Sequence, residues 1–248
     1  MRGRFLDCTL GNPFLNLALE EALFVLLDVP VLRVWDNQRS IVIGRAQLAR
    51  TEVDVEGCRQ KSVPVVRRFT AGGAVYNGPG NINWSFFVPS KSREAGGARV
   101  FDAKRVFSPF AATLAEALER CSACCRYEPP NQIVNDLGKV SGMAAYMASK
   151  GVICHGTLLL EADLEEVEAL TKLQDIGADK RYVRSRHTRV ANCGVQRETF
   201  VKALRAVNAE YASGSPRAAE LALASRLTAE RYSTDRWNLG DPFLLDYL

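Results

Sequence analysis

In the segment 81–88, polar and apolar side chains alternate from Asn81 to Phe86. The polar positions are Asn81, Asn83 and Ser85. Because successive side chains of a strand point to opposite faces, this pattern predicts a strand with one polar face and one core face. Apolar runs predict further strands at 31–35, 40–43, 63–68, 126–134, 139–147 and 151–160, with a turn at 148–151 between the last two.

Helices are expected between these strands. Asn12 and Pro13 are typical of an N-cap and a first helical position, and the helix that they open extends to about Leu27. Further helices are predicted at 45–61, at 109–125, after Asp163, at 197–211 and at 216–232. This order predicts an α+β fold, a mixed and largely antiparallel sheet covered by helices. Neither an internal repeat nor a linker is evident, so we expect a single domain over residues 1–248.

The composition is that of a globular protein. Of the 248 residues, 47% are hydrophobic and 24% are charged, which excludes disordered and collagen-like chains. The longest apolar run, at 22–32, is too short to span a bilayer, and the N-terminus lacks the apolar stretch of a signal peptide. We therefore expect a cytoplasmic protein without a membrane partner. The net charge of +4 is too small to indicate nucleic-acid binding.

The seven cysteines form neither a recognisable metal site nor a complete disulfide framework. Cys121 and Cys124 have one CxxC spacing, but no second CxxC exists. The only histidines, His155 and His187, are not at ligand spacing from each other or from these cysteines. We interpret the cysteines at 121–125 as small core residues near the end of a helix.

A glycine-rich segment follows the strand expected at 63–68. Arg67 and Arg68 end that strand, and small residues, among them Gly72 and Gly73, then allow a tight turn. Amides freed in such a turn, with a guanidinium beside them, form an anion site for phosphate or carboxylate. The segment matches neither the dinucleotide fingerprint nor the phosphate-binding loop of nucleoside triphosphatases. The alternative is a plain turn with two solvent-facing arginines.

Three other segments carry candidate chemistry. The polar face of the strand at 81–88 suits hydrogen bonding to a ligand, although exposed strands carry such faces too. Strand alternation places Lys139 and Ser141 on one face, where an unpaired lysine should meet an anion; a surface hairpin is the alternative. His155 and Thr157 share a strand face, and the glycine between them allows close approach to the backbone. With only two histidines, no Ser-His-Asp set can be assembled.

Together and in this order, these segments resemble the lipoate–protein ligases, within the wider biotin and lipoate ligase superfamily. The family pattern is a double-Arg, triple-Gly loop, an Asn-x-Asn strand, an Asn-Asp pair before Lys-x-Ser-Gly, and a His-Gly-Thr-Leu-Leu strand. The corresponding segments here are 67–76, 80–83, 135–142 and 155–159, and 42–47 and 183–186 also look like family segments. The resemblance extends from Leu17 to about Asn192.

Three places depart from the family pattern. Ala71 stands where the triple glycine begins, Asn77 and Gly78 replace the usual His-Asp pair, and Cys154 precedes His155 where a second histidine is common. Ala71 is small enough to leave the loop in place. We also expect no separate C-terminal accessory domain of the kind that many ligases of this family carry.

The resemblance implies a fold similar to class II aminoacyl-tRNA synthetases and biotin ligases, and a two-step reaction. Lipoate and ATP with Mg²⁺ would give lipoyl-adenylate, and a lysine amine of a carrier domain would then attack the acyl carbon. The implied carriers are the E2 subunits of 2-oxoacid dehydrogenases or the H protein of glycine cleavage. We further expect that activation needs a separately encoded accessory domain.

The resemblance also implies roles for individual residues. Lys139 would be catalytic, offsetting charge on the lipoyl carbonyl oxygen and the α-phosphate. The residues implied for ATP or adenylate are Arg68, Gly73, Ala74, Val75, Tyr76, Asn135, Asp136 and Lys139, with Asp136 the candidate for Mg²⁺. The residues implied for lipoate are Arg68, Gly73, Asn83, Lys139, His155, Gly156 and Thr157. Trp35, Val75 and Leu158 are candidates for the apolar slot that holds the dithiolane.

The basic segment 181–189 has two interpretations. Arg184 and Arg186 would close over the adenylate or meet an acidic carrier domain, or the segment is a solvated basic loop.

Two other functions remain open at this point. Relatives that transfer octanoyl groups use a cysteine nucleophile without ATP; Cys154 and Cys125 are candidates, although the resemblance would place that cysteine at 128–131. A catalytically silent subunit of a two-part ligase is the non-enzymatic alternative. A biotin ligase is disfavoured because its Gly-Arg-Gly-Arg-type loop is absent.

Overall fold

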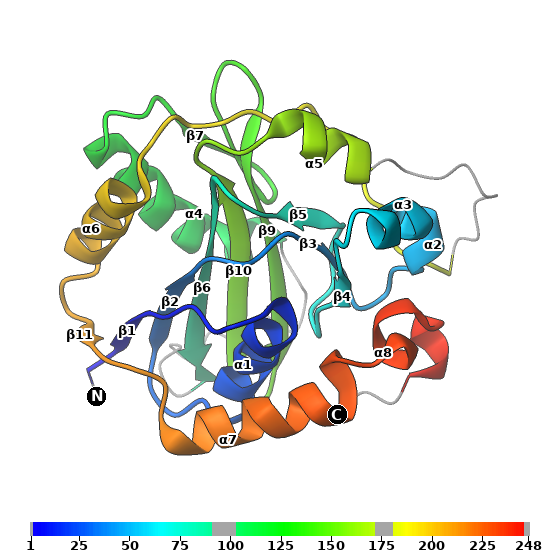
Figure 1. Cartoon of the computed structure of the whole chain (residues 1–248). Coiled ribbons are helices and arrows are strands. Elements are labelled where there is room, and N and C mark those ends of the chain that lie inside the picture. The colour runs from blue at the N-terminus through cyan, green and yellow to red at the C-terminus, as the bar shows by residue number, and fades with distance from the viewer. Residues whose placement is uncertain (1, 91–102, 172–180, 246–248) are drawn as a thin grey trace.

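The computed structural model describes residues 2–90, 103–171 and 181–245, and an eight-stranded sheet lies at its centre (Figure 1). The strands are β1 (Arg4–Asp7), β2 (Val31–Trp35), β6 (Asn81–Pro89), β7 (Arg126–Glu128), β8 (Gln132–Val134), β9 (Lys139–Ala148), β10 (Gly151–Leu159) and β11 (Ala212–Ser213). Their spatial order is β11-β1-β2-β6-β10-β9-β8-β7. The first three are parallel, and every later pair is antiparallel. The expected mixed, largely antiparallel sheet is confirmed.

A second sheet has three strands, β3 (Ser40–Ile43), β4 (Val65–Arg67) and β5 (Val75–Asn77). Their order is β4-β3-β5, with β3 parallel to β4 and antiparallel to β5. The sequence predicted β3 and β4 but neither β5 nor the separation into two sheets. Strand pairing depends on partners distant in the chain, which local alternation does not reveal.

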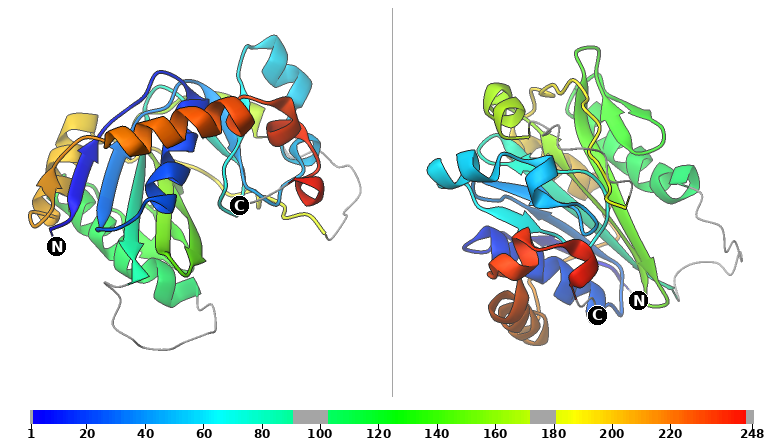
Figure 2. Two further views of the ribbon diagram at one scale, coloured as in Figure 1. Left: turned by 90° about the horizontal axis from the view of Figure 1, so that it is seen from below. Right: turned by 90° about the vertical axis from the view of Figure 1, so that its right-hand side faces the viewer.

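Helices cover both faces of the large sheet (Figures 1 and 2). One face packs against α4 (Ala103–Arg120) and α6 (Arg197–Val207), and the other against α1 (Pro13–Val25) and α7 (Ala218–Leu227). The shorter elements are α2 (Ala49–Glu52), α3 (Val55–Gln60), α5 (Leu164–Leu170), α8 (Asp235–Leu239), a π-helical turn at Thr228–Tyr232 and a 3₁₀ turn at Pro242–Leu244. Within the described ranges, no helix combines the length and apolar character needed to cross a membrane.

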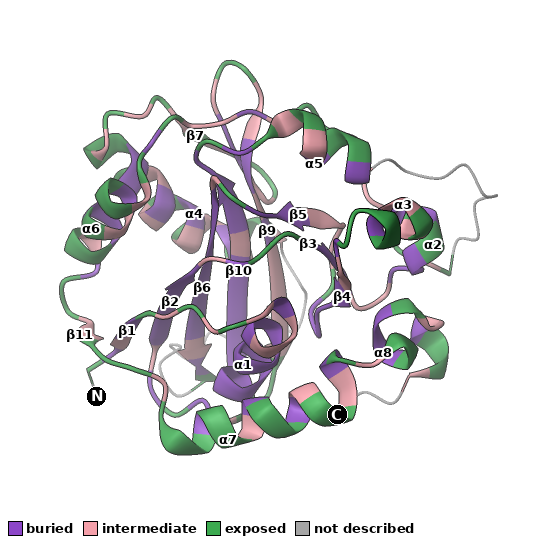
Figure 3. Cartoon of the chain, in the orientation of Figure 1, coloured by how far each residue is buried: buried purple, intermediate pink, exposed green. Residues whose placement is uncertain are grey.

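The strand β6 organises the core. Ile82, Trp84 and Phe86 face α4 and α6, as the alternation predicts. The opposite, polar face is also covered, since every residue from Asn81 to Phe87 is buried (Figure 3). The alternative of an ordinary solvent-exposed polar face is therefore wrong, and its buried polar groups need partners.

Three predicted elements differ from the observed ones. The helix expected at 45–61 is two short helices, α2 and α3, because Asp54 caps a new helix by accepting a hydrogen bond from the Gly57 amide. The strand expected at 126–134 is the hairpin β7–β8. The helix α4 begins at Ala103 and contains Pro109, whereas the sequence predicted that the helix starts at Pro109.

Candidate functional site

The glycine-rich segment lies between β4 and β5, and both of its arginines are buried. The Arg68 guanidinium donates from Nη2 to the carbonyl oxygens of Ala71 (2.8 Å) and Gly73 (2.9 Å). It also donates to the Val42 carbonyl and, from Nε, to Thr70 Oγ1 at 3.1 Å. Burial lowers the pKa of Arg68 to about 10. The alternative of two solvent-facing arginines is wrong; Arg68 holds the turn in shape.

The turn needs glycine at its centre. Gly72 has a φ of +107°, and a Cβ there would lie 2.7 Å from Arg68 Nη2 and 3.3 Å from Ala144 Cβ. The turn therefore sits directly over the large sheet. Because β5 begins at Val75, only the Gly73 and Ala74 amides of the predicted anion site belong to the turn, and Val75 and Tyr76 belong to the sheet.

A polar row crosses the face of the large sheet that packs against α1. Cross-strand pairing brings Trp35 opposite Asn83, Asn83 opposite Thr157, and Thr157 opposite Gly142. Asn83 is 4% exposed, and its Nδ2 has no hydrogen-bond partner among the described residues. A buried donor without a partner is costly, so this row is suited to a ligand that brings an acceptor.

Lys139 reaches this row from the start of β9. A Cβ on Gly142 would lie 2.8 Å from Lys139 Nζ, so the ammonium lies over Gly142 in space that a larger residue would occupy. The expectation that Lys139 and Ser141 share a face is wrong, because the β8–β9 register shifts between Ile133 and Val134, and Ser141 pairs with Leu158 of the core. Burial lowers the pKa of Lys139, and no carboxylate among the described residues forms an ion pair with it.

His155 links the turn to a buried ion pair beneath it. Its Nε2 lies 2.7 Å from Thr70 Oγ1 and its Nδ1 lies 3.3 Å from Glu20 Oε2. Glu20 also pairs with Arg33 at 3.0 Å and accepts from the Ser85 hydroxyl. Burial raises the pKa of the Glu20 carboxyl, but His155, Arg33 and Ser85 outweigh burial and lower that pKa. Nδ1 therefore donates to the carboxylate, and Nε2 accepts from Thr70.

Burial also lowers the pKa of His155 itself, so the imidazole is neutral at pH 7. The buried chain therefore runs from Arg33 through Glu20, His155 and Thr70 to Arg68. It fixes the turn relative to the sheet.

The segment from residue 183 to residue 190 spans from the turn to β9. Ser185 Oγ accepts from the Ala74 amide at 2.8 Å, and Arg184 Nε lies 2.7 Å from the buried Glu52 Oε1. At the other end, the Arg189 carbonyl accepts from the Lys139 amide at 2.9 Å. Arg186 is exposed. The structure thus favours a docked segment over a solvated loop, with Arg184 held by Glu52.

The structure does not bring every predicted residue to this face. Gly156 faces the core, where a Cβ would lie 2.8 Å from the Trp84 ring, so its role is close packing rather than ligand contact. Leu158 belongs to the same core and cannot line a slot on the polar face. Asn135 builds the β8–β9 turn by accepting from the Leu137 and Gly138 amides, each at 3.0 Å.

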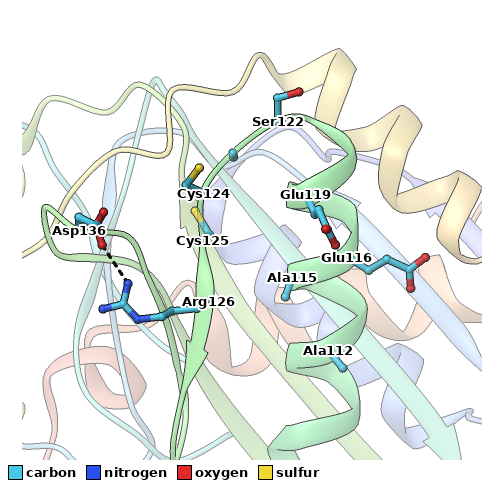
Figure 4. A pocket seen from close by; sticks show the side chains of 10 residues that line it. Ala112, Ala115, Glu116, Glu119, Ser122, Cys124, Cys125, Arg126 and Asp136 are labelled. Carbon is cyan, nitrogen blue, oxygen red and sulfur yellow. Dashed lines mark hydrogen bonds and ion pairs between the residues drawn. The ribbon is translucent and has the colours of Figure 1, made fainter.

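Asp136 lies in a separate, open pocket of about 720 Å³ at the end of α4 (Figure 4). Its carboxylate is 92% exposed and pairs with Arg126 at 3.1 Å. Cys124 and Cys125 line the same pocket. Cys125 and Cys121 pack against the core as expected, whereas Cys124 is exposed, contrary to the sequence interpretation.

Sequence reasoning missed Glu20, Arg33, Gln47 and Glu52. The signal was present for Glu20 and Glu21, which stand side by side in a largely apolar helix and are its only charged residues. Both are buried, and a charge at such a position indicates a buried partner.

Comparison with known proteins gives a consistent result. Residues 12–206 match the family described as the lipoyl protein ligase A/B catalytic domain. Among curated relatives, lipoate-protein ligase A subunit 1 of Thermoplasma acidophilum is 26% identical over 97% of both chains. A putative lipoate-protein ligase A of Aeropyrum pernix is 33% identical, and the match covers 66% of this chain and 60% of the relative. For the Bacillus subtilis ligase LplJ, at 30% identity, the match covers 74% of this chain and 53% of the relative.

Solved structures agree with these matches. A lipoate-protein ligase A bound with ATP has a TM-score of 0.82 at 26% identity, over 97% of this chain and 99% of that one. A T. acidophilum structure with bound lipoic acid has a TM-score of 0.81 at 25% identity, over 97% and 100%. A structure from a bi-partite ligase and E2 lipoyl domain system of the same organism has a TM-score of 0.83 at 26% identity, over 100% and 99%.

Proposed function

Because the chain belongs to the lipoyl protein ligase A/B catalytic-domain family, we propose that it is a lipoate–protein ligase. In this proposal it activates lipoate with ATP as lipoyl-adenylate and transfers the lipoyl group to a lysine of a carrier domain. The relatives solved with ATP and with lipoic acid support this choice of substrates. The carriers that we propose are lipoyl domains of E2 subunits or the glycine cleavage H protein, and the first is supported by the E2 lipoyl domain named in the related system.

The observation that carries the proposal is the polar row beneath the glycine-rich turn. Lys139 Nζ, the unpartnered Nδ2 of Asn83 and the Thr157 side chain lie on one sheet face. Each offers a hydrogen to an oxygen-rich substrate, and the ammonium adds a positive charge. This donor set suits a carboxylate and its adenylate.

Two substitutions make up the proposed reaction. A carboxylate oxygen of lipoate attacks the α-phosphorus of ATP, and pyrophosphate leaves. The unprotonated amine of the carrier lysine then attacks the acyl carbon, the bond between that carbon and the phosphate oxygen breaks, and AMP leaves as the amide forms and a proton passes from the nitrogen to solvent. Negative charge builds on the α-phosphate in the first step and on the acyl oxygen in the second. Lys139 stabilises both without acting as a nucleophile.

Arg68 and His155 act differently from the sequence expectation in this proposal. The Arg68 guanidinium already donates four hydrogen bonds within the protein, three of them to the turn and one to the Val42 carbonyl. Both ring nitrogens of His155 are likewise engaged, by Thr70 and Glu20. We therefore assign both residues to positioning the turn, whose Gly73 and Ala74 amides remain the proposed phosphate contacts.

Asp136 does not fit the expected Mg²⁺ role. Its exposed carboxylate pairs with Arg126 in the pocket of Figure 4. Within residues 2–90, 103–171 and 181–245, no group of three or more His, Cys, Asp or Glu side chains is arranged to hold a metal ion. Mg²⁺ commonly binds through substrate phosphates with few protein ligands, so we assign no residue of this chain to it.

We also propose that full activation of lipoate requires a second subunit. The support is the match to 97% of a relative named as subunit 1, together with the bi-partite ligase to which the related structure belongs. We expect transfer from preformed lipoyl-adenylate to proceed without that subunit.

The surroundings of Cys154 and Cys125, the two candidate nucleophiles, do not favour a cysteine-dependent transferase. Cys154 is fully buried in the core beneath the sheet, and burial raises its pKa well above the usual thiol value. Burial also raises the pKa of Cys125. Neither thiol is suited to form a thiolate nucleophile near neutral pH.

The test is the mass shift of a purified lipoyl carrier domain, with lipoate plus Mg²⁺-ATP in one arm and synthetic lipoyl-adenylate in the other. We expect modification from the adenylate, and modification from lipoate plus ATP only when an accessory subunit is added. Modification in both arms without it would refute the need for a second subunit. Absence of modification in every arm would refute the ligase assignment. A carrier whose target lysine is replaced by arginine is the control.

A further inference from the structure

Ser185 occupies a well-defined oxygen position beside the glycine-rich turn. Its Oγ accepts from the Ala74 amide at 2.8 Å and from Gln47 Nε2 at 3.0 Å. The same hydroxyl comes within 3.1 Å of where a Cβ on Gly73 would lie, so glycine leaves just enough room for it. Two donors from separate elements therefore converge on one oxygen atom.

Both donors are fixed before any ligand arrives. Gln47 Oε1 accepts from the Gly44 amide at 2.8 Å, while Nε2 donates to Glu52 Oε2 at 2.6 Å. A carboxylate only accepts, so these contacts determine which end of the amide is nitrogen. The second hydrogen of Nε2 is then aimed at Ser185 Oγ. Gln47 and Glu52 are both fully buried.

The same carboxylate holds Ser185 in place. Glu52 Oε2 accepts from the Ser185 amide at 2.8 Å, and Glu52 Oε1 pairs with Arg184 at 2.7 Å. Arg184 offsets the negative charge of Glu52, so the carboxylate does not by itself forbid an anion nearby. The backbone of Ser185 is thus anchored independently of its hydroxyl.

We propose that the Ala74 amide and Gln47 Nε2 form a two-donor site for a phosphate oxygen of the nucleotide, and that this oxygen displaces the Ser185 hydroxyl. The inference rests on the proposed ligase function and adds Gln47 as a nucleotide-binding residue. An anionic phosphate oxygen is a stronger acceptor than a neutral hydroxyl for the same two hydrogens. Ser185 is accordingly a competitor for the site rather than a ligand contact.

The deciding variant is Ser185→Ala, with equilibrium binding of Mg²⁺-ATP as the readout. Removing the hydroxyl leaves both donors without their protein acceptor, so ATP no longer competes with it. We expect the ATP Kd to fall about 2- to 10-fold, the range that one net hydrogen bond provides. Adenosine, which lacks phosphate, should bind Ser185→Ala and the wild type equally. Thr188→Ala is the matched control and should leave the ATP Kd unchanged, because Thr188 is exposed on the same segment and its hydroxyl contacts only the Arg186 carbonyl in the hydrogen bond found for it.

A second variant tests the donor side. Gln47→Met keeps the side-chain length without the amide, and it should weaken ATP binding several-fold while adenosine binding stays the same. Its folding is checked by circular dichroism, and Ser185→Ala decides the question if Gln47→Met is misfolded.

An unchanged or higher ATP Kd for Ser185→Ala would overturn the inference. The proposed ligase function would still stand if the wild-type protein binds ATP and modifies the carrier. A wild-type protein that binds no ATP would also overturn the inference, whereas the ligase function is overturned only if the carrier is modified in no arm of its own test. Tighter binding of adenosine by Ser185→Ala would also overturn the inference, because the gain would not come from phosphate.

Discussion

Replacing Lys139 by methionine separates its effect on activity from its effect on stability. The change keeps an apolar stem over Gly142 and removes only the ammonium. If that charge supports the acyl oxygen and the α-phosphate in the transition states, turnover should fall about 10²- to 10³-fold, or about 2.7–4 kcal/mol of activation free energy.

Stability should move in the opposite direction. Burial lowers the pKa of Lys139, so the folded protein binds this proton less tightly than the unfolded chain does. The ammonium therefore opposes folding at neutral pH. Burying a donor without an ion-pair partner costs about 1–3 kcal/mol of folding free energy. Because Lys139→Met removes that donor, we expect the free energy of unfolding to stay unchanged or to rise by up to about 1 kcal/mol.

The assay combines two measurements. Carrier modification is followed by mass from lipoyl-adenylate, and from lipoate plus ATP with the accessory subunit present, and the free energy of unfolding is measured in urea. Lys150→Met is the control, because Lys150 is exposed in the β9–β10 turn. If Lys139→Met turns over within about threefold of the wild type, the ammonium does not stabilise the transition states and the proposed electrostatic role is refuted. A loss of stability above about 2 kcal/mol would refute the argument that the ammonium is unpaired.

The buried ion pair under the turn gives two further predictions. Glu20→Ala should lower the free energy of unfolding by about 3–5 kcal/mol, because it leaves the fully buried Arg33 guanidinium without its carboxylate; a loss under about 1 kcal/mol in urea denaturation would contradict the pairing. Stability should also fall as the pH drops below about 6.5, where His155 takes up a proton in the unfolded chain but resists it in the folded one, since burial lowers its pKa. The loss from this one group approaches about 1.4 kcal/mol per pH unit, and His155→Gln should reduce that slope.

The sequence predicted the elements that depend on local patterns. The polar and apolar alternation located β6, and the Asn12–Pro13 start located α1, because side-chain period and capping act over a few residues. The ordered motifs also brought His155 and Lys139 to notice. These features carry their signal in residue type and spacing alone.

The remaining parts of the site depend on contacts between distant residues. Nothing near Arg68 in the chain shows that its guanidinium is committed to its own turn, and Gly156 looks like a ligand-facing glycine until Trp84 is placed against it. The register shift at Ile133–Val134 decides which face Lys139 uses, and a one-residue shift reverses every side chain of a strand. Ser185 meets Ala74 across more than a hundred residues.

Arg67 connects β4 to residues near the C-terminus of the chain. Its fully buried guanidinium donates to the carbonyl oxygens of Trp237, Asn238 and Gly240, and its amide donates to the Asn238 side chain. The family match ends at residue 206, well before these acceptors. A fragment cut at that limit would keep every recognised motif but lose these four hydrogen bonds to Arg67 in β4, the strand that leads into the glycine-rich turn. The region defined by sequence likeness is therefore smaller than the unit that must fold together.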